Sequence, residues 1–171
     1  MNQDMKKEMT APIRDFHLPR YQEIPEVGLY LEQTAKYIAG YMEPLQDISI
    51  TGSMISNYVK KKLVANPVKK QYSRDQIAYL IFIAIAKSVL SLDNVRVMLD
   101  MQRQICDSRT AYDYFCTEFE NIAAHVFGLR EYPDMLDTDD SAEKNMLRNM
   151  IITVAHKIYL DRYFSLLRSS S

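Results

Sequence analysis

The sequence contains few of the residues that end helices, form tight turns or cross-link a chain. Only four glycines and six prolines occur among its 171 residues, and this scarcity favours helices over hairpin-rich sheets. The sequence has no glycine-rich phosphate loop. Its two cysteines, Cys106 and Cys116, are too few for a disulfide scaffold or a four-ligand zinc site. We expect two buried thiols rather than a disulfide or a redox switch.

Long apolar runs are also missing. The longest uncharged stretch in the apolar centre of the chain, residues 76–86, has 11 residues. A membrane-spanning helix needs about 20. The first residues contain no apolar signal-peptide region, so we expect a cytoplasmic protein without a membrane partner. A formal net charge of −1 also argues against a nucleic-acid partner, unless the charge is unevenly distributed.

Residue patterns typical of catalytic or metal sites are absent. The three histidines, His17, His125 and His156, lie in separate segments with no second ligand or base at helical spacing. The acidic stretch at 134–140 lacks the glycine and the final glutamate that a calcium-binding loop requires. No nucleophile is paired with a base. We therefore expect that the protein is not an enzyme and holds no metal or cofactor.

The residues that are present predict an all-α fold. Apolar residues recur at spacings of three and four, which indicates five to six helices. They cover about 26–42, 51–62, 77–90, a segment that begins at Ser91, 110–127, and 141–167. Ser73 with Gln76 predicts a capping box before the third helix, and Gly128 predicts the end of the fifth. Residues 64–71 form either a loop or a short two-stranded wing.

Positive charge is concentrated in one part of the chain. Residues 58–74 contain six basic residues and no acidic one, a charge of +6, and the rest of the chain has 15 basic residues against 22 acidic ones, a balance of −7. Lysines at a helix C-terminus stabilise the helix dipole and often form a solvated face. The other interpretation is contact with phosphates, since a short exposed helix backed by a longer apolar one suits the major groove.

Residues 48–99 contain, in order, ISITGSMISNYVKKKLV, ANPVKKQYS, RDQIAYLIFI and LSLDNVRVML. These segments resemble the DNA-binding half of MerR-type winged helix-turn-helix regulators. They resemble more closely a bacterial family of domains of unknown function that is expected to carry this motif. The resemblance places the aromatic residue of the recognition helix at Tyr58, the wing signature at Lys70 and Tyr72, and a helix start at Ser91. It implies a DNA-binding transcription regulator.

The predicted DNA interface consists of the 51–62 helix in the major groove and the 64–72 wing on the phosphates. Its candidate residues are Thr51, Ser53, Ser56, Asn57, Tyr58, Lys60, Lys61, Lys62, Lys69, Lys70, Tyr72 and Arg74. Ser56 and Asn57 stand where MerR-type regulators have Arg-Tyr. A second function therefore stays open, a protein-interaction module built on a helix-turn-helix scaffold that does not bind DNA.

The chain divides into a tail or docking strap (1–20), a MerR-like helix-turn-helix domain (21–102) and a C-terminal helical subdomain for dimerisation or effector binding (103–171). One recognition helix contacts few base pairs, so we expect a homodimer on double-stranded DNA. The apolar stripe of residues 147–167 is the candidate dimer surface, unless it packs within the monomer.

Four aromatic residues near the start of the fifth predicted helix have two interpretations. At helical spacing such residues most often belong to the core, and the alternative is the lining of a pocket for an unknown small-molecule effector. The four are Tyr112, Tyr114, Phe115 and Phe119.

Overall fold

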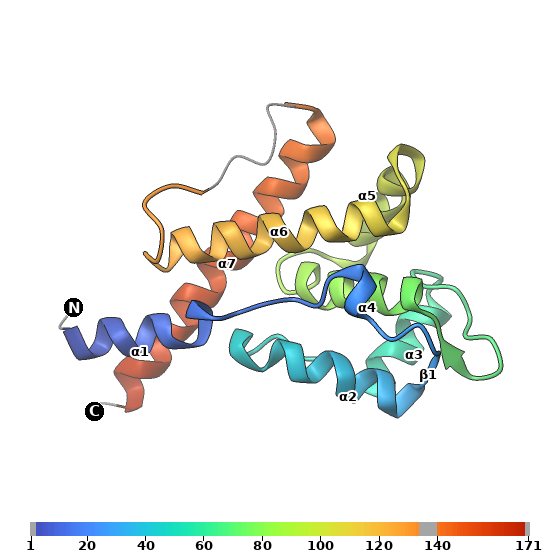
Figure 1. Cartoon of the computed structure of the whole chain (residues 1–171), viewed down its shortest axis with the longest axis horizontal. Coiled ribbons are helices and arrows are strands. Elements are labelled where there is room, and N and C mark those ends of the chain that lie inside the picture. Colours follow the sequence, from blue (N-terminus) through green and yellow to red (C-terminus); the bar gives the residue numbers. More distant parts are fainter. Residues whose placement is uncertain (1–2, 134–139, 170–171) are drawn as a thin grey trace.

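The structure is a computed structural model that describes residues 3–133 and 140–169. Within them the chain is mostly helical, with seven α-helices and one two-stranded sheet (Figure 1). The elements are α1 (Gln3–Arg14), β1 (Leu29–Tyr30), α2 (Leu31–Met42), α3 (Gly52–Lys60), β2 (Gln71–Tyr72), α4 (Arg74–Ala86), α5 (Leu92–Ile105), α6 (Ser108–Val126) and α7 (Ala142–Ser169), with 3-10 turns at Tyr21–Glu23 and Glu43–Leu45.

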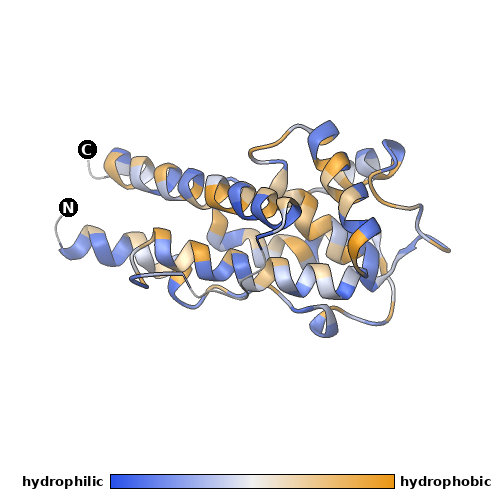
Figure 2. Cartoon of the chain, turned by 90° about the horizontal axis from the view of Figure 1, so that it is seen from above, coloured by the Kyte–Doolittle hydropathy of each residue, from blue (hydrophilic) through white to orange (hydrophobic). Residues whose placement is uncertain are grey.

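The helix in excess of the prediction lies in the expected N-terminal tail. Residues 3–14 form α1, whose Met9 and Ile13 are buried one helical turn apart. α1 runs beside the C-terminal half of α7, and the two termini lie at the same end of the molecule (Figures 1 and 2). Arg162 in α7 donates a hydrogen bond to the carbonyl of Glu8 at 2.9 Å. The sequence did not predict this helix because residues 3–14 have no long apolar period. Packing against α7 stabilises the helix instead.

The segment after α1 runs alongside α6 as a strap, which we define as residues 15–24 (Figure 1). Leu18 and Ile24 anchor it and are fully buried. Arg20 donates two hydrogen bonds to the carboxylate of Glu120, at 2.7 and 2.8 Å, and the same carboxylate accepts from the Leu18 amide at 2.8 Å. Of the residues expected to form a tail or docking strap (1–20), residues 15–20 thus belong to a strap that packs on α6.

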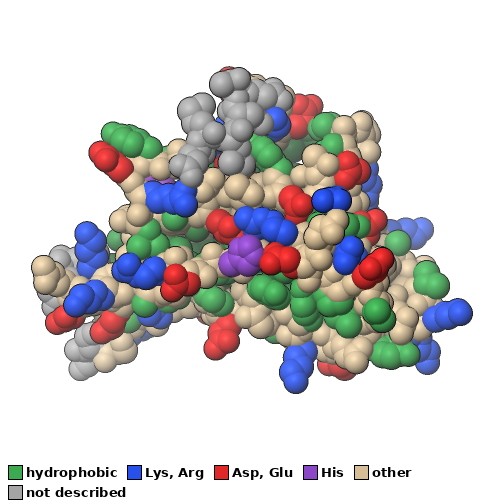
Figure 3. Space-filling view, in the orientation of Figure 1, with side chains coloured by type: hydrophobic (Ala, Val, Ile, Leu, Met, Phe, Trp, Pro, Cys, Tyr) green, Lys and Arg blue, Asp and Glu red, His purple; other side chains and the backbone are tan. Residues whose placement is uncertain are grey.

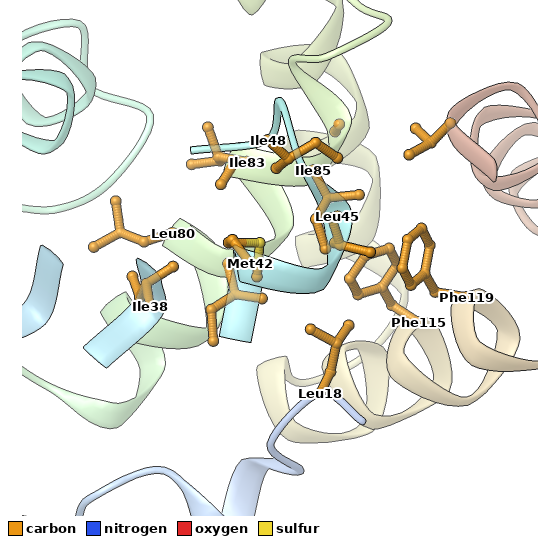
Figure 4. Close-up of a cluster of buried hydrophobic side chains, with 14 of the residues drawn as sticks. Leu18, Ile38, Met42, Leu45, Ile48, Leu80, Ile83, Ile85, Phe115 and Phe119 are labelled. Carbon is orange, nitrogen blue, oxygen red and sulfur yellow. The ribbon is translucent and has the colours of Figure 1, made fainter. Parts of the chain in front are cut away.

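The core is built around α4, which is buried on nearly every side, as its apolar sequence predicts. Side chains from the strap, α2, α4 and α6 converge there, with Leu18, Met42, Ile83 and Phe119 among them (Figure 4). α6 packs on both α4 and α7, so the C-terminal helices and the rest of the chain share one core.

The predicted helix boundaries agree best with those of the structure where a side chain caps the helix. Thr51, Ser73 and Ser91 accept hydrogen bonds from the backbone three residues ahead, at the starts of α3, α4 and α5. Gly128 follows α6 with φ of +73°. α2 begins at Leu31, about five residues later than predicted, because the chain before it forms β1 instead.

The predicted wing forms a strand, but its partner comes from upstream. β2 pairs antiparallel with β1, so that Leu29 lies opposite Tyr72 and Tyr30 opposite Gln71. A Cβ added to Gly28 would lie 2.8 Å from the Cβ of Gln71, so this close approach requires glycine. The sheet therefore ties the base of the wing to the start of α2.

Candidate nucleic-acid interface

α3 presents one polar, exposed face. Ser53, Ser56, Asn57 and Lys60 are exposed and lie at the spacings of three and four that place residues on one side of a helix. The opposite side carries Ile55 and other buried residues. The three small side chains before Lys60 leave the helix backbone open to the close approach of a partner surface.

α3 ends in a tight left-handed turn at a lysine. Lys62 has φ of +59°, and its amide donates to the Val59 carbonyl at 2.9 Å. The Leu63 amide donates to the Tyr58 carbonyl at 2.9 Å. This pair of bonds is the Schellman ending, in which the left-handed residue is usually glycine.

A second left-handed turn forms the tip of the wing. Val68 and Gln71 exchange two backbone hydrogen bonds, at 3.1 and 2.9 Å, around the intervening Lys69 and Lys70. The φ angles of these lysines are +50° and +64°. Positive φ at both central residues defines a type I′ turn, which favours asparagine and glycine. Both lysine side chains are exposed.

Side chains from α4 and α5 hold the basic segment in place. The buried amide of Gln76 donates to the carbonyls of Ala65 and Asn66, at 2.9 and 3.0 Å. In α5, Arg103 donates to the Leu63 carbonyl at 3.2 Å, and Arg96 donates to the carbonyls of Lys61 and Lys62. The basic segment is therefore a fixed part of the fold.

Four of the predicted interface residues instead support the fold. Tyr58 is 2% exposed and Tyr72 4% exposed, and burial raises the pKa of Tyr72. Arg74 donates to the Ile24 carbonyl at 2.8 Å, and its guanidinium lies 5.6 Å from the centre of the Tyr21 ring. Thr51 caps α3, although it remains exposed. These residues position the surface rather than form it.

The remaining eight predicted residues are exposed and come from one continuous segment of the chain. We call them the basic face: Ser53, Ser56, Asn57, Lys60, Lys61, Lys62, Lys69 and Lys70. The wing projects at the right-hand end of Figure 1, and Lys and Arg side chains project from the same end in the space-filling view (Figure 3). α1, which carries Lys6 and Lys7, lies at the opposite end (Figure 1).

Sequence reasoning missed Arg96, which adds a positive charge beside the basic face. It lies 34 residues after Lys62 in the chain, and the only sign of its role is its place on α5, a helix whose other face is buried. A local charge count cannot find a residue that joins a surface through a tertiary contact.

Other kinds of site find no support in the described residues. Residues 3–133 and 140–169 contain no cluster of three or more His, Cys, Asp or Glu that could hold a metal ion. Asp134, Asp137 and Asp139 of the rejected calcium loop lie outside these ranges. Both cysteines are free thiols, and burial raises the pKa of Cys116 to about 12, which leaves it unreactive. Cys106 is only half-buried, which corrects the expectation of two buried thiols.

The part of the chain that the structure describes contains no helix long and apolar enough to cross a membrane.

The connection from α2 to α3 spans residues 43–51 and includes a 3-10 turn. It is longer than the turn of about three to four residues in a simple helix-turn-helix.

Comparison with known proteins places the chain in a family. Neither the curated proteins nor the solved structures contain a match to it. Residues 19–115 match the family described as a domain of unknown function, DUF1836. The match begins in the strap, includes α2 to α5 with the whole basic face, and ends in α6. Because it covers more than half of the sequence, the chain belongs to the DUF1836 family.

Proposed function

We propose that this protein binds double-stranded DNA, with the exposed face of α3 in the major groove and the lysines of the wing on the phosphates. Lysines that neutralise phosphates supply affinity through the release of counterions. Asn57 on α3 supplies the amide that can pair with an adenine edge. The basic face has this combination of a polar helix and adjacent lysines.

The observation that carries this proposal is the presence of lysine at three left-handed backbone positions. Lys62, Lys69 and Lys70 all have positive φ, where a residue with a Cβ is destabilised by roughly 1–2 kcal/mol. Residues held in such conformations cluster at functional sites. Glycine would relieve the strain but remove the charge, so a role for the charge accounts for all three lysines.

The arrangement around the basic face supports a winged helix-turn-helix. β1 precedes α2, α3 follows, and the wing returns to pair with β1 before α4 begins. The hydrogen bonds from Gln76, Arg96 and Arg103 hold α3 and the wing in one orientation. A surface ordered before binding loses less conformational entropy when the DNA docks.

We also propose that the protein binds DNA as a homodimer through α7, since one short helix contacts few base pairs. The apolar stripe of residues 147–167 packs largely within the monomer, and other apolar residues are exposed on the opposite side of α7. Met150, Ile151 and Val154 are buried within the monomer, which is the alternative that the sequence left open for this stripe. Leu160 and Phe164 lie one turn apart and are 49% and 50% exposed.

Selection from randomised duplex DNA, followed by binding measurements at several salt concentrations, tests the proposal. Enrichment of a consensus, with an affinity that falls steeply as salt rises, is expected. A well-folded protein that enriches no sequence and whose binding is insensitive to salt would contradict it. That outcome would favour the alternative function, a protein-interaction module on the same scaffold.

A further inference from the structure

A large apolar pocket lies between α4, α5, α6 and the start of α7. Its volume is about 650 Å³, within the range of roughly 300–1,000 Å³ that is typical of small-molecule sites. Its wall includes the aromatic residues Tyr79, Phe82 and Phe115 and the methionines Met98, Met101 and Met146. An open apolar space of this size lacks the packing contacts that a filled core has.

The aromatic strip contributes to both the core and the pocket wall, and Tyr112 and Phe115 belong to both. Phe119 is fully buried in the core, where its ring contacts that of Phe115 at a centroid distance of 5.9 Å. Tyr112, Tyr114 and Phe115 line the pocket. Ile105 at the end of α5 is 59% exposed where it borders the same space.

One cluster of polar groups in the pocket wall is satisfied within itself, and the charged side chains Glu143 and Lys144 line the pocket at the start of α7. The Tyr79 hydroxyl donates to the side-chain oxygen of Gln102 at 3.0 Å and lies 3.2 Å from the Ser108 hydroxyl. The amide of Gln102 donates to the Cys106 carbonyl at 2.8 Å. A charged ligand is therefore not required to satisfy this cluster, and the apolar surface selects the ligand. Methionine side chains adapt to ligands of different shape.

We infer that this pocket binds a small, neutral, aromatic molecule. Rings of such a ligand would stack against Tyr79 and Phe82, which are only partly buried, and the flexible methionines would fill the remaining space. The pocket does not include the basic face, so this inference stands apart from DNA binding.

One wall of the pocket is also the support of the basic segment. Arg103 lies with its guanidinium 5.1 Å from the centre of the Tyr79 ring and donates to the Leu63 carbonyl. Arg96, on the same helix, donates to the carbonyls of Lys61 and Lys62. A ligand that packs against α5 therefore fixes the helix that holds the end of α3. This second step, a change in DNA affinity on ligand binding, rests on the proposed function.

The test uses the full chain and the neutral fluorescent probe N-phenyl-1-naphthylamine. Saturable binding of one probe per chain is expected. Ala111→Phe, which fills the pocket, should weaken it by about tenfold or more, equivalent to about 1.4 kcal/mol. Ala124→Phe, the same substitution on α6 away from the pocket-lining residues, is the matched control and should leave probe affinity within about twofold of wild type. Met101→Trp on α5 provides a second filled pocket if Ala111→Phe fails to fold.

Failure of the binding site and failure of the coupling give different results. Absence of saturable binding, or equal binding by the filled variants, would overturn the site. Probe affinity that falls as protein concentration rises would overturn it too, because a second copy of the chain would then cover the pocket. Slower amide exchange at residues 61–71 with probe bound supports the coupling even if the protein binds no DNA. Arg103→Gln should still bind the probe but should no longer show slower amide exchange at residues 61–71. If the slower exchange persists in this variant, the coupling is overturned.

Discussion

Lysine stands at three backbone positions of the basic face where glycine or asparagine would be less strained. At Lys69 and Lys70 the backbone of the type I′ turn favours Asn-Gly, which carries no charge, whereas the proposed phosphate contacts require lysine. If these lysines contact DNA as proposed, we expect a substitution there to change the stability of the fold and the affinity for DNA in opposite directions. Substitutions at these positions can therefore separate a structural role from a functional one.

We predict that Lys69→Asn combined with Lys70→Gly stabilises the fold but weakens DNA binding. The free energy of unfolding should rise by about 1 kcal/mol, since Asn-Gly fits the turn. The slope of log affinity against log salt should become shallower by about 2, one unit for each lost phosphate contact. Chemical denaturation and fluorescence anisotropy at several salt concentrations measure the two effects.

The matched control removes the same charge from the other end of the molecule. Lys6→Gln with Lys7→Gln changes two exposed lysines of α1 and should leave the salt slope nearly unchanged. Equal losses of affinity in the two double variants would show that net charge, rather than the basic face, attracts the DNA.

At Asn57 we expect an effect on sequence preference more than on affinity. Asn57→Ala removes an exposed side-chain amide from the middle of α3, and an amide–adenine pair contributes about 1–3 kcal/mol of discrimination. Selection from random duplexes should return a consensus that is relaxed at one position. Ser53→Ala, on the same face of α3, is the control, and an identical change in both variants would argue against a specific role for Asn57.

At the scale of the elements, the strap and α5 each hold other elements in place. The strap is joined to α6 by the pair Arg20–Glu120, whose hydrogen bond raises the pKa of Arg20. The side chains of Arg20 and Glu120 are only 27% and 20% exposed, so the pair is shielded from solvent more than a surface ion pair is.

We predict that Glu120→Gln lowers the free energy of unfolding by about 2 kcal/mol. The substitution removes the charge and one of the oxygens that accept from Arg20 and the Leu18 amide, and hydrogen bonds to charged groups contribute roughly 1.5–3 kcal/mol. Thermal denaturation followed by circular dichroism measures the change. Glu26→Gln, an exposed glutamate outside this cluster, should have little effect, and a loss as large as that of Glu120→Gln would refute the explanation.

At the scale of the whole molecule, the basic face is separated from the exposed Leu160 and Phe164 of α7. The basic face lies at one end, and α1 with the end of α7 lies at the other (Figures 1 and 2). In the proposed complex, the acidic balance of the remaining chain would disfavour DNA elsewhere on the surface and so orient docking. This separation would leave Leu160 and Phe164 accessible to a second copy of the chain in the proposed DNA complex.

We predict that Leu160→Glu combined with Phe164→Glu produces a monomer with an intact fold. Both side chains are about half exposed, so the cost to the monomer is small, but two carboxylates in an apolar interface would prevent association. Sedimentation velocity measures the oligomeric state. A wild-type protein that is already monomeric at all concentrations, with DNA affinity equal to that of the variant, would refute the dimer.

The helices and their caps could be predicted from the sequence because they depend on neighbours in the chain. Ser73 with Gln76 and the apolar run after them identify α4 by local hydrogen bonding and burial. The charge segregation that leads to the basic face is equally local, since the lysines occupy one short segment.

Only the tertiary structure decided which residues of that segment face outward and what supports them. Tyr58 and Tyr72 are amphipathic, and their burial depends on α4 and β1, which the local pattern does not specify. α1 becomes helical through its contact with α7, and Arg96 meets the basic face across 34 residues of chain. The pocket, too, arises only where four helices meet. Local hydrogen bonds and periodicity thus determine the elements, and long-range packing determines the surface that they form.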